Sequence, residues 1–223
     1  CIGLGRVEDA EAVVDAIEMY RSTGEQGKQN RGSYVSELSS AKRFKEAHAL
    51  WLIEHPANSN DALGVISDAG FEQESNLEEP GFGWRIVNKG PSLHLDMSAP
   101  EEGRSSLRVD FEGNSDPGSP VISQLLLVEP AAQYQISFAT RTEDIVTGGP
   151  PLLIIIDANN QQVIAKSAEF PRETVGWQYF TVEFNSTDST TAIQITFQRQ
   201  SCNTSPCPIF GSVWLDAFSL RKL

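Results

Sequence analysis

The apolar positions near the start of the chain follow a helical period. Up to about residue 55 they recur at spacings of three and four, beginning with the stripe Ala10, Val13, Val14, Ile17 and Tyr20. Gly24 and Gly27 are expected to end this first helix. A second helical stretch is expected over about 33–54, with a candidate break at residues 39–40 and a stop at Pro56. Its buried side is predicted to hold Leu38, Ala41, Phe44, Ala47, Leu50 and Trp51.

From about Asn58 onward, short alternating runs replace the helical period. They cover residues 63–66, 84–87, 93–97, 105–111, 121–128, 134–141, 152–157, 163–165, 177–184, 192–199 and 212–220. The alternation is cleanest in four triplets: Leu107/Val109/Phe111, Tyr134/Ile136/Phe138, Phe180/Val182/Phe184 and Ile193/Ile195/Phe197. Many short strands with turn clusters and no helix between them predict a β-sandwich or a barrel.

The last of these runs carries a carboxylate among apolar side chains. Read as a regular strand, it places Trp214, Asp216, Phe218 and Leu220 on one face, because successive side chains alternate across a sheet. A charge facing the core needs either a cation nearby or a bend that returns it to water. A second acid, Glu72, follows the aromatic Phe71 near the start of the same region.

The two patterns divide the chain into a helical segment at 1–57 and an all-β region at 58–223. The fold class is therefore predicted as α+β by segments, an N-terminal helical hairpin or repeat followed by an all-β sandwich. A formal net charge of -13 and a pI near 4.6, with no basic stripe, argue against a nucleic-acid partner. No apolar run approaches the roughly 20 residues that a membrane-spanning helix needs.

A catalytic role has little support in the sequence. No Gly-rich phosphate loop, zinc-protease helix or nucleophile elbow occurs. His94 has no identifiable Ser or Cys partner, so a solvated strand histidine is the favoured interpretation. The facing carboxylate pair of a glycosidase cannot be singled out among 30 acids. We therefore expect no enzyme activity.

Two of the three cysteines, Cys202 and Cys207, are close enough in sequence to form a disulfide across a small loop. Such a bond would place the domain in an oxidising, extracytoplasmic compartment: periplasm, cell surface or medium. The alternative is a pair of free thiols in a cytosolic loop. Cys1 is consistent with a processed lipoprotein or with a fragment of a longer chain, and the helical segment favours the fragment.

The helical segment contains an internal echo. Residues 5–13 align with 42–50 at an offset of 37 positions, with the identical pairs Arg6/Arg43, Ala10/Ala47 and Ala12/Ala49. This segment resembles the tetratricopeptide repeat, whose second helix commonly begins with a glycine, a bulky residue, two acids and an alanine. The resemblance implies a truncated array with a concave surface for a protein partner. The alternative is an ordinary helical hairpin.

The order of short motifs in the β region carries a second resemblance. The matching pieces are 70–72 (Gly-Phe-Glu), 83–84 (Gly-Trp), 103–109, 124, 128–134, 137–138, 176–177 (Gly-Trp), 184 and 214–220. From about residue 64 to the end, the chain is similar to galactose-binding-like jelly rolls, particularly carbohydrate-binding modules of families 4, 9 and 22. The resemblance implies a jelly-roll sandwich whose first and last strands are tied by a structural calcium ion.

The implied calcium ligands are the carboxylates of Glu72 and Asp216, with backbone oxygens from the loop around Gly103. The alternative is that Asp216 pairs with Arg104 or Arg221, or caps a turn. Modules of this kind hold sugars on the outer face of one sheet or at the loops, with aromatic rings and hydrogen-bonding side chains.

The outward-pointing candidates for sugar contacts are Tyr179, as a stacking platform, with Gln135, Arg141, Gln194 and Gln198. Any solvated sheet face carries such polar residues, which is the competing interpretation. Three tryptophans, at 84, 177 and 214, are expected in the core.

Two hypotheses follow for function. The first is a non-catalytic module that binds a glycan or polysaccharide and is attached to the helical repeats of a longer extracytoplasmic protein. The second is a protein-interaction or structural scaffold with no sugar ligand.

Overall fold

The computed structural model describes residues 25–55, 63–73, 80–87, 90–203 and 205–223. The chain separates into two compact units, Cys1–Ser59 and Asn60–Leu223, and each is described by itself. The first predicted helix, with its stripe at residues 10–20, and the first half of the internal echo lie outside the described residues.

The first unit contains two described helices, α2 (Glu25–Ser40) and α3 (Phe44–Trp51). Gly27 lies inside α2, so the prediction that it ends a helix is wrong, and α2 begins well before residue 33. The predicted break lies at residues 41–43 and not at 39–40, which still belong to α2. There the chain turns through Lys42, whose φ of 61° is left-handed, and the Arg43 amide bonds back to the Leu38 carbonyl at 2.8 Å.

The two helices bury apolar side chains from both, namely Val35, Leu38, Phe44, Ala47, Leu50 and Trp51. Ala41, predicted to be buried, is exposed because it lies in the turn that follows α2. An ion pair joins Arg31 of α2 to Glu54. Two helices suit both a repeat and a simple hairpin, so the repeat interpretation stays a prediction. No helix among the described residues is long and apolar enough to cross a membrane.

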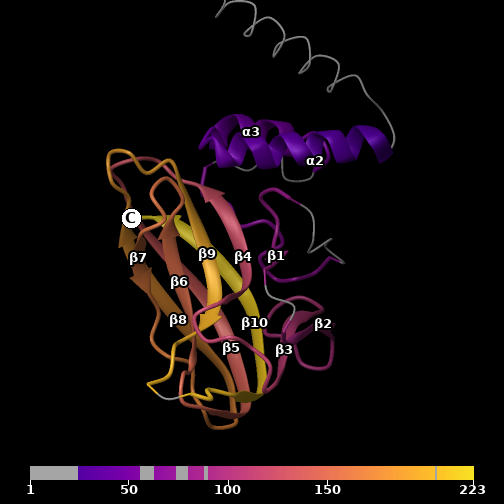
Figure 1. Ribbon diagram of the computed structural model, residues 1–223, viewed down its shortest axis with the longest axis vertical. Helices are drawn as coiled ribbons and strands as arrows, with labels where there is room; N and C mark the ends of the chain where they lie inside the picture. Colours follow the sequence, from indigo (N-terminus) through magenta and orange to yellow (C-terminus); the bar gives the residue numbers. More distant parts are fainter. Residues whose placement is uncertain (1–24, 56–62, 74–79, 88–89, 204) are drawn as a thin grey trace, which may run out of the picture. The chain divides into compact units, whose positions relative to one another are not determined.

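The second unit is the predicted antiparallel β-sandwich (Figure 1). The strands are β1 (Arg85–Ile86), β2 (Ser92–Asp96), β3 (Ser106–Glu112), β4 (Pro120–Leu127), β5 (Gln133–Thr147), β6 (Pro151–Asp157), β7 (Val163–Lys166), β8 (Val175–Asn185), β9 (Ala192–Arg199) and β10 (Ile209–Lys222). The first sheet has the order β1-β4-β9-β6-β7, and the second sheet has the order β2-β3-β10-β5-β8. Two such layers are the arrangement expected of a jelly roll.

One predicted strand is absent from the structure. Residues 63–64 form a turn, residues 65–66 have no regular structure, and Gly64 has a φ of +91°, which a strand residue does not adopt. The segment 63–73 instead covers the core with Ile66 and Phe71, which are 6% and 1% exposed. The Phe218 amide of β10 donates to its Ala69 carbonyl at 2.9 Å, so the start and the end of the sandwich lie together.

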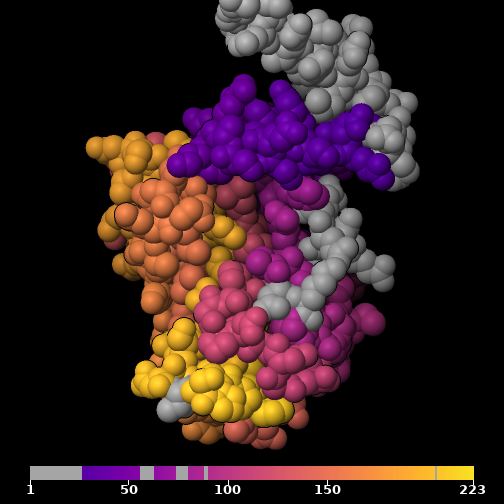
Figure 2. All heavy atoms as spheres, in the orientation of Figure 1, coloured from indigo at the N-terminus to yellow at the C-terminus, as the bar shows by residue number. Residues whose placement is uncertain are grey.

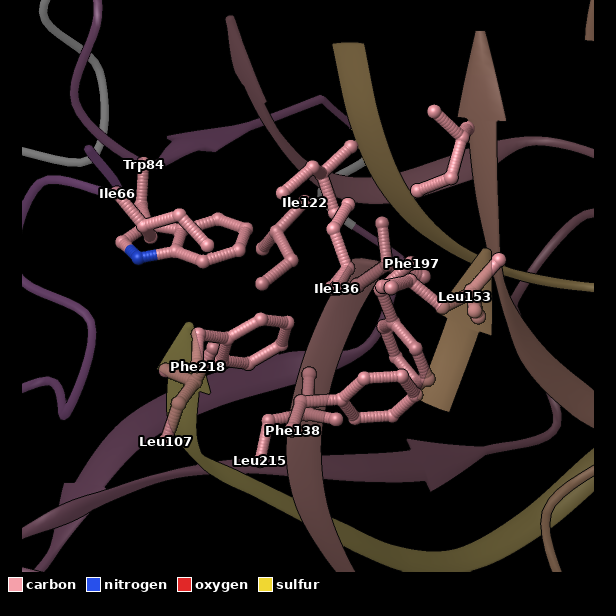
Figure 3. Close-up of a cluster of buried hydrophobic side chains, with 14 of the residues drawn as sticks. Ile66, Trp84, Leu107, Ile122, Ile136, Phe138, Leu153, Phe197, Leu215 and Phe218 are labelled. Atoms are coloured by element: carbon pink, nitrogen blue, oxygen red, sulfur yellow. The ribbon is translucent and has the colours of Figure 1, made fainter. Parts of the chain in front are cut away.

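Between the sheets lies a continuous apolar core (Figure 3). The four predicted triplets supply much of it, since all their members are buried except Phe180, which is partly buried. Aromatic rings interlock at one end, where Phe218 packs 4.9 Å from Trp84 and 5.2 Å from Phe138, measured between ring centroids. Burial of these alternating side chains is the main source of the stability of the sandwich.

Strand β10 does not keep a single alternation. Val213 and Leu215 face the core, so Trp214 between them faces outward. The register then shifts between Asp216 and Ser219, and Ala217 takes a left-handed φ of 53°. This bulge brings Phe218 into the core. The prediction that Trp214, Asp216 and Phe218 share one core-facing side is therefore wrong, because one extra residue reverses the parity.

Arg199, at the end of β9, joins two loops and the end of β5 at one end of the sandwich. Its side chain is fully buried and donates to the Ser115 carbonyl at 2.9 Å, to Thr147 Oγ1 at 3.1 Å and to the Pro208 carbonyl at 3.4 Å. Burial lowers the pKa of this guanidinium. The buried guanidinium of Arg199 thus binds uncharged oxygens from segments that are far apart in the sequence.

The predicted disulfide between Cys202 and Cys207 is confirmed and lies against this arginine, with their Cα atoms 5.8 Å apart. It closes the loop that connects β9 to β10. Figure 2 shows this loop beside the segment around residue 115 at the lower end of the sandwich.

Candidate functional site

Asp216 lies at a corner of the sandwich, fully buried by the loop that follows β2. Its Oδ2 accepts hydrogen bonds from the Glu101 amide at 2.8 Å and the Glu102 amide at 3.1 Å. Its Oδ1 accepts one from the Ala217 amide at 2.7 Å, inside the β10 bulge. Burial raises the pKa of this carboxyl group, and the nearby charge of Glu102 adds to the effect.

Glu72 occupies the same corner and is held in a similar way. Its carboxylate accepts from the Arg104 amide at 2.9 and 3.0 Å and from the Ser105 amide at 3.4 Å, and the Arg104 side chain lies 3.5 Å away. The Arg104 amide is the main cause that lowers the pKa of Glu72. Oxygens of Glu72 and Asp216 each lie 3.6 Å from the position that a Cβ on Gly70 would take.

The corner offers two carboxylates of the type that calcium prefers. Among the described residues, no group of three or more His, Cys, Asp or Glu side chains is arranged for a metal ion, so further ligands would have to be uncharged oxygens, such as those of the backbone. No ion pair involves Asp216 in the described part of the chain, and Arg104 pairs with Glu72 instead. A buried carboxylate held only by neutral amides leaves a negative charge that a cation would balance.

Gly103 is required by this arrangement. Its φ is +65°, and a Cβ there would lie 1.9 Å from Glu72 Oε1, closer than any real contact. We expect Gly103→Ala to displace the Glu72 carboxylate and to lower the free energy of unfolding by about 1–3 kcal/mol. Chemical denaturation would measure this loss. An equal loss in Gly176→Ala, where a Cβ would meet nothing within 4 Å, would contradict the explanation.

The loop at residues 97–105 runs across the outer face of the second sheet. It leaves β2 at one edge, passes over Asp216 of β10, and reaches β8 at the opposite edge. There the Trp177 indole donates from Nε1 to the Ala99 carbonyl at 3.0 Å. The neighbouring carboxylate of Glu101 raises the pKa of Tyr179.

Beside this loop, side chains of neighbouring strands form a row across the outer face of the second sheet. The pairing places His94 opposite Arg108, Arg108 opposite Trp214, and Trp214 opposite Arg141. The guanidinium carbons of Arg108 and Arg141 lie 4.7 and 4.4 Å from the centroid of the Trp214 ring. Trp214 is buried as predicted, but between two arginines on the outer face and not in the core.

Trp214 is further fixed by Asp96, which accepts its indole N–H at 2.6 Å. Hydrogen bonds from the hydroxyl and amide of Ser98, together with that of Trp214, lower the pKa of Asp96 to about 2. Arg108 is neutralised separately, because its Nε donates to Asp110 at 2.8 Å. The row is therefore rigidly supported by carboxylates from β2 and β3.

Two aromatic rings lie on the outer side of the edge strand β8. Tyr179 is 59% exposed, as predicted for a stacking platform. Trp177, predicted to be in the core, is only half-buried and lies on the same side of the strand as Tyr179. The sequence could have predicted the outward position of Trp177. Residues two apart in a strand share a face, so Trp177 goes with Tyr179, whereas Phe180, Val182 and Phe184 occupy the face toward the core.

The structure does not bring the five predicted sugar contacts together. Tyr179, Gln135 and Arg141 lie on the outer face of the second sheet, where Gln135 bonds to Glu183 at 3.2 Å. Gln194 and Gln198 belong to β9 and lie on the outer face of the first sheet, on the opposite side of the sandwich. Alternation places a side chain outward but does not say on which sheet.

The outer face of the first sheet is different in character. Around Gln194 and Gln198 its outward strand positions include the apolar Leu125, Leu152, Ile154 and Ile156. Among the described strand residues of this face, none is aromatic. The face lacks the flat rings on which a sugar stacks.

A hollow of about 590 Å³ opens beside β2 and the acidic corner. Its lining includes Phe71, Glu72, His94, Met97 and Arg104. Phe71 is 1% exposed, and no exposed Phe, Tyr or Trp contributes to the lining among the described residues. The hollow offers less to a sugar than the outer face of the second sheet.

No protein-family model and no curated protein sequence matches this chain. Solved structures with a similar fold include one named "CBM4 structure and function", at 14% identity over 71% of this chain and 100% of that chain, with a TM-score of 0.49. Another is the CBM22-1–GH10 part of Clostridium thermocellum xylanase 10B complexed with xylohexaose, at 12% identity over 71% of this chain and 28% of that chain, with a TM-score of 0.49. A third is TmCBM61 in complex with β-1,4-galactotriose, at 19% identity over 73% of this chain and 100% of that chain, with a TM-score of 0.46. Because the identities are below 20% and the TM-scores are below 0.5, the fold is assigned from the sheet topology alone.

Proposed function

We propose that this protein is a non-catalytic module that binds a glycan on the outer face of the second sheet. The observation that carries the proposal is the aromatic pair on the edge strand, the exposed Tyr179 with Trp177 on the same side of β8. Flat rings at an accessible edge, next to hydrogen-bonding side chains, suit the apolar face and the hydroxyl groups of a sugar ring. The resemblance to carbohydrate-binding modules of families 4, 9 and 22 implies the same class of ligand.

The carboxylates of this face support binding more than catalysis. Asp96 holds the Trp214 indole, and Asp110 accepts from Arg108 and from the Ser212 hydroxyl. Both acids are thus occupied in orienting side chains. The disulfide supports an extracytoplasmic location, because such bonds persist where the medium is oxidising.

Binding to a panel of soluble polysaccharides tests this function. We expect Tyr179→Ala to weaken the binding of the glycan that the wild-type protein retains by about 2- to 10-fold, the range measured for aromatic contacts. Affinity electrophoresis or titration calorimetry would measure it. Gln194→Ala, on the first sheet, is the matched control and should bind as wild type. The scaffold alternative expects no binding to any member of the panel.

We also propose a structural calcium ion at the acidic corner, with Glu72 and Asp216 as carboxylate ligands and the loop around Gly103 as the source of backbone oxygens. The support is the buried, uncompensated charge of Asp216 beside a second carboxylate. Because a ligand of the native state stabilises it, we expect a chelator to lower the melting temperature by about 5 °C, and added calcium to restore it.

The control for calcium is Asp216→Asn, which removes one ligand charge. Its melting temperature should not respond to the chelator or to calcium. A wild-type protein whose melting temperature is the same in chelator and in excess calcium would contradict the proposed site.

A further inference from the structure

Arg141 differs from the other arginine that contacts Trp214. Arg108 is neutralised by Asp110 and also donates to Ser212. Arg141 is half-buried, lies 4.4 Å from the centroid of Trp214, and forms no hydrogen bond or ion pair with any described residue. Its guanidinium donors are therefore held at a fixed place without an acceptor.

The guanidinium of Arg141, fixed in place and with N–H donors that are free among the described residues, is preorganised to bind an oxyanion. The ring of Trp214 contacts it, and Trp214 is itself held by Asp96, so little side-chain freedom remains to be lost on binding. The planar fork of N–H donors matches two oxygens of one carboxylate, which gives the stronger, charge-assisted kind of hydrogen bond.

Arg141 lies next to the aromatic pair. In the β5–β8 pairing, Ala139 lies directly opposite Tyr179, and Arg141 is two residues further along β5 on the same side. The pairing shifts register between Thr140 and Thr142, where β8 carries one extra residue, so Arg141 keeps its place along β5. Diagonal neighbours of this kind in a sheet are separated by about 7–8 Å between their Cα atoms. One sugar can therefore stack on an aromatic ring while its substituent reaches the guanidinium.

We propose that the ligand is an acidic glycan, one that carries uronic acid carboxylates, and that Arg141 binds the carboxylate while Tyr179 stacks on the ring. This inference rests on the proposed function and names its substrate class. The protein's net charge of -13 opposes a polyanion at long range, and Glu101, Glu102 and Glu143 lie around the same face. Salt screens charges that are more than about 8 Å apart, so a single carboxylate at Arg141 is little affected by the distant negative charges of the protein. A densely sulfated chain would bring further negative charges close to the glutamates, so we expect isolated carboxylates to be preferred.

The first test compares polyuronates with their methyl esters on the wild-type protein. Polygalacturonate, alginate and glucuronoxylan represent the acidic class, and galactan and unsubstituted xylan represent the neutral class. We expect an acidic member to bind, and its methyl-esterified form to bind about 10- to 100-fold more weakly, because a charge-assisted hydrogen bond is lost. This comparison changes no residue, so it does not depend on the folding of a variant.

The second test uses Arg141→Met and Arg141→Lys with Arg85→Met as the matched control. Arg85 is an exposed arginine on the outer face of the first sheet, so its replacement changes the net charge equally. We expect Arg141→Met to lose the preference for the free acid, Arg141→Lys to keep part of it, and Arg85→Met to keep all of it. Thermal denaturation would show whether each variant is folded.

The outcomes separate the two proposals. Binding to neutral glycans only, or acidic binding that methyl esterification and Arg141→Met leave unchanged, overturns the acidic class and keeps the glycan-binding function. No binding to any acidic or neutral glycan overturns both.

Discussion

Replacing Asp216 by alanine is expected to lower the free energy of unfolding by about 3 kcal/mol, because each unpaired buried donor costs about 1–3 kcal/mol. Three backbone amides, of Glu101, Glu102 and Ala217, lose their acceptor at once. Their positions join the loop at 97–105 to the bulge of β10, so local order should fall with the stability. Urea denaturation with and without a chelator would measure the change.

Two further variants sharpen this expectation. Asp216→Asn keeps one acceptor oxygen and should lose less than alanine, whereas Glu112→Ala removes an exposed carboxylate and should change little. A loss below about 1 kcal/mol in Asp216→Ala, within the range of ordinary surface changes, would contradict the role given to this side chain.

The burial of Asp216 should also make the free energy of unfolding depend on pH. Burial raises the pKa of Asp216, so without a bound cation the folded protein holds this proton more tightly than the unfolded chain. The resulting contribution to stability is complete below the ordinary carboxyl pKa and is lost as the pH rises through the raised value. Asp216→Asn should remove this slope, and bound calcium should offset it.

Arg199→Ala is expected to lower the free energy of unfolding by about 3–5 kcal/mol, through a cavity and the loss of buried hydrogen bonds. The side chain is fully buried, and the carbonyls of Ser115 and Pro208 would lose their donor. Because these acceptors belong to separate loops, the loops should also become open to proteolysis. Denaturation and limited proteolysis of the oxidised protein would measure both effects.

Arg199→Met separates the two causes, because it keeps most of the volume and removes every donor. Arg221→Ala, at an exposed arginine of β10, is the matched control and should stay within about 0.5 kcal/mol of wild type. If Arg199→Ala were as stable as Arg221→Ala, the convergence of loops on this cation would have no energetic importance.

The bulge in β10 shows what sequence pattern can and cannot determine. Alternation located the strand and its aromatic residues, yet it assigned Trp214 and Phe218 to one face. A bulge is set by the pairing of β10 with β5, far away in sequence, and by the left-handed conformation of Ala217. Neither the pairing nor this conformation can be predicted from the spacing of hydrophobic residues along β10.

The location of the proposed binding face depended in the same way on tertiary pairing. That Tyr179, Gln194 and Gln198 point outward follows from alternation, because each is the direct neighbour of a residue whose side chain faces the core. That Tyr179 shares a sheet with Arg141, while the two glutamines belong to the opposite sheet, follows only from the strand order. The path of the loop from β2 to β8 and the contact of Arg141 with Trp214 are likewise consequences of contacts between distant segments.

The sequence by itself determined the elements of this protein: the break between two helices, the strands of an antiparallel sandwich, its alternating core and the disulfide. These follow from local periods of 3.6 and 2 residues and from short loop lengths. Tertiary structure decided which strands are neighbours, and hence that two acids share a corner and that Arg141, which has no partner among the described residues, lies beside the exposed Tyr179 and the half-buried Trp177. Such neighbours are chosen by the packing of the whole core, which no local pattern contains.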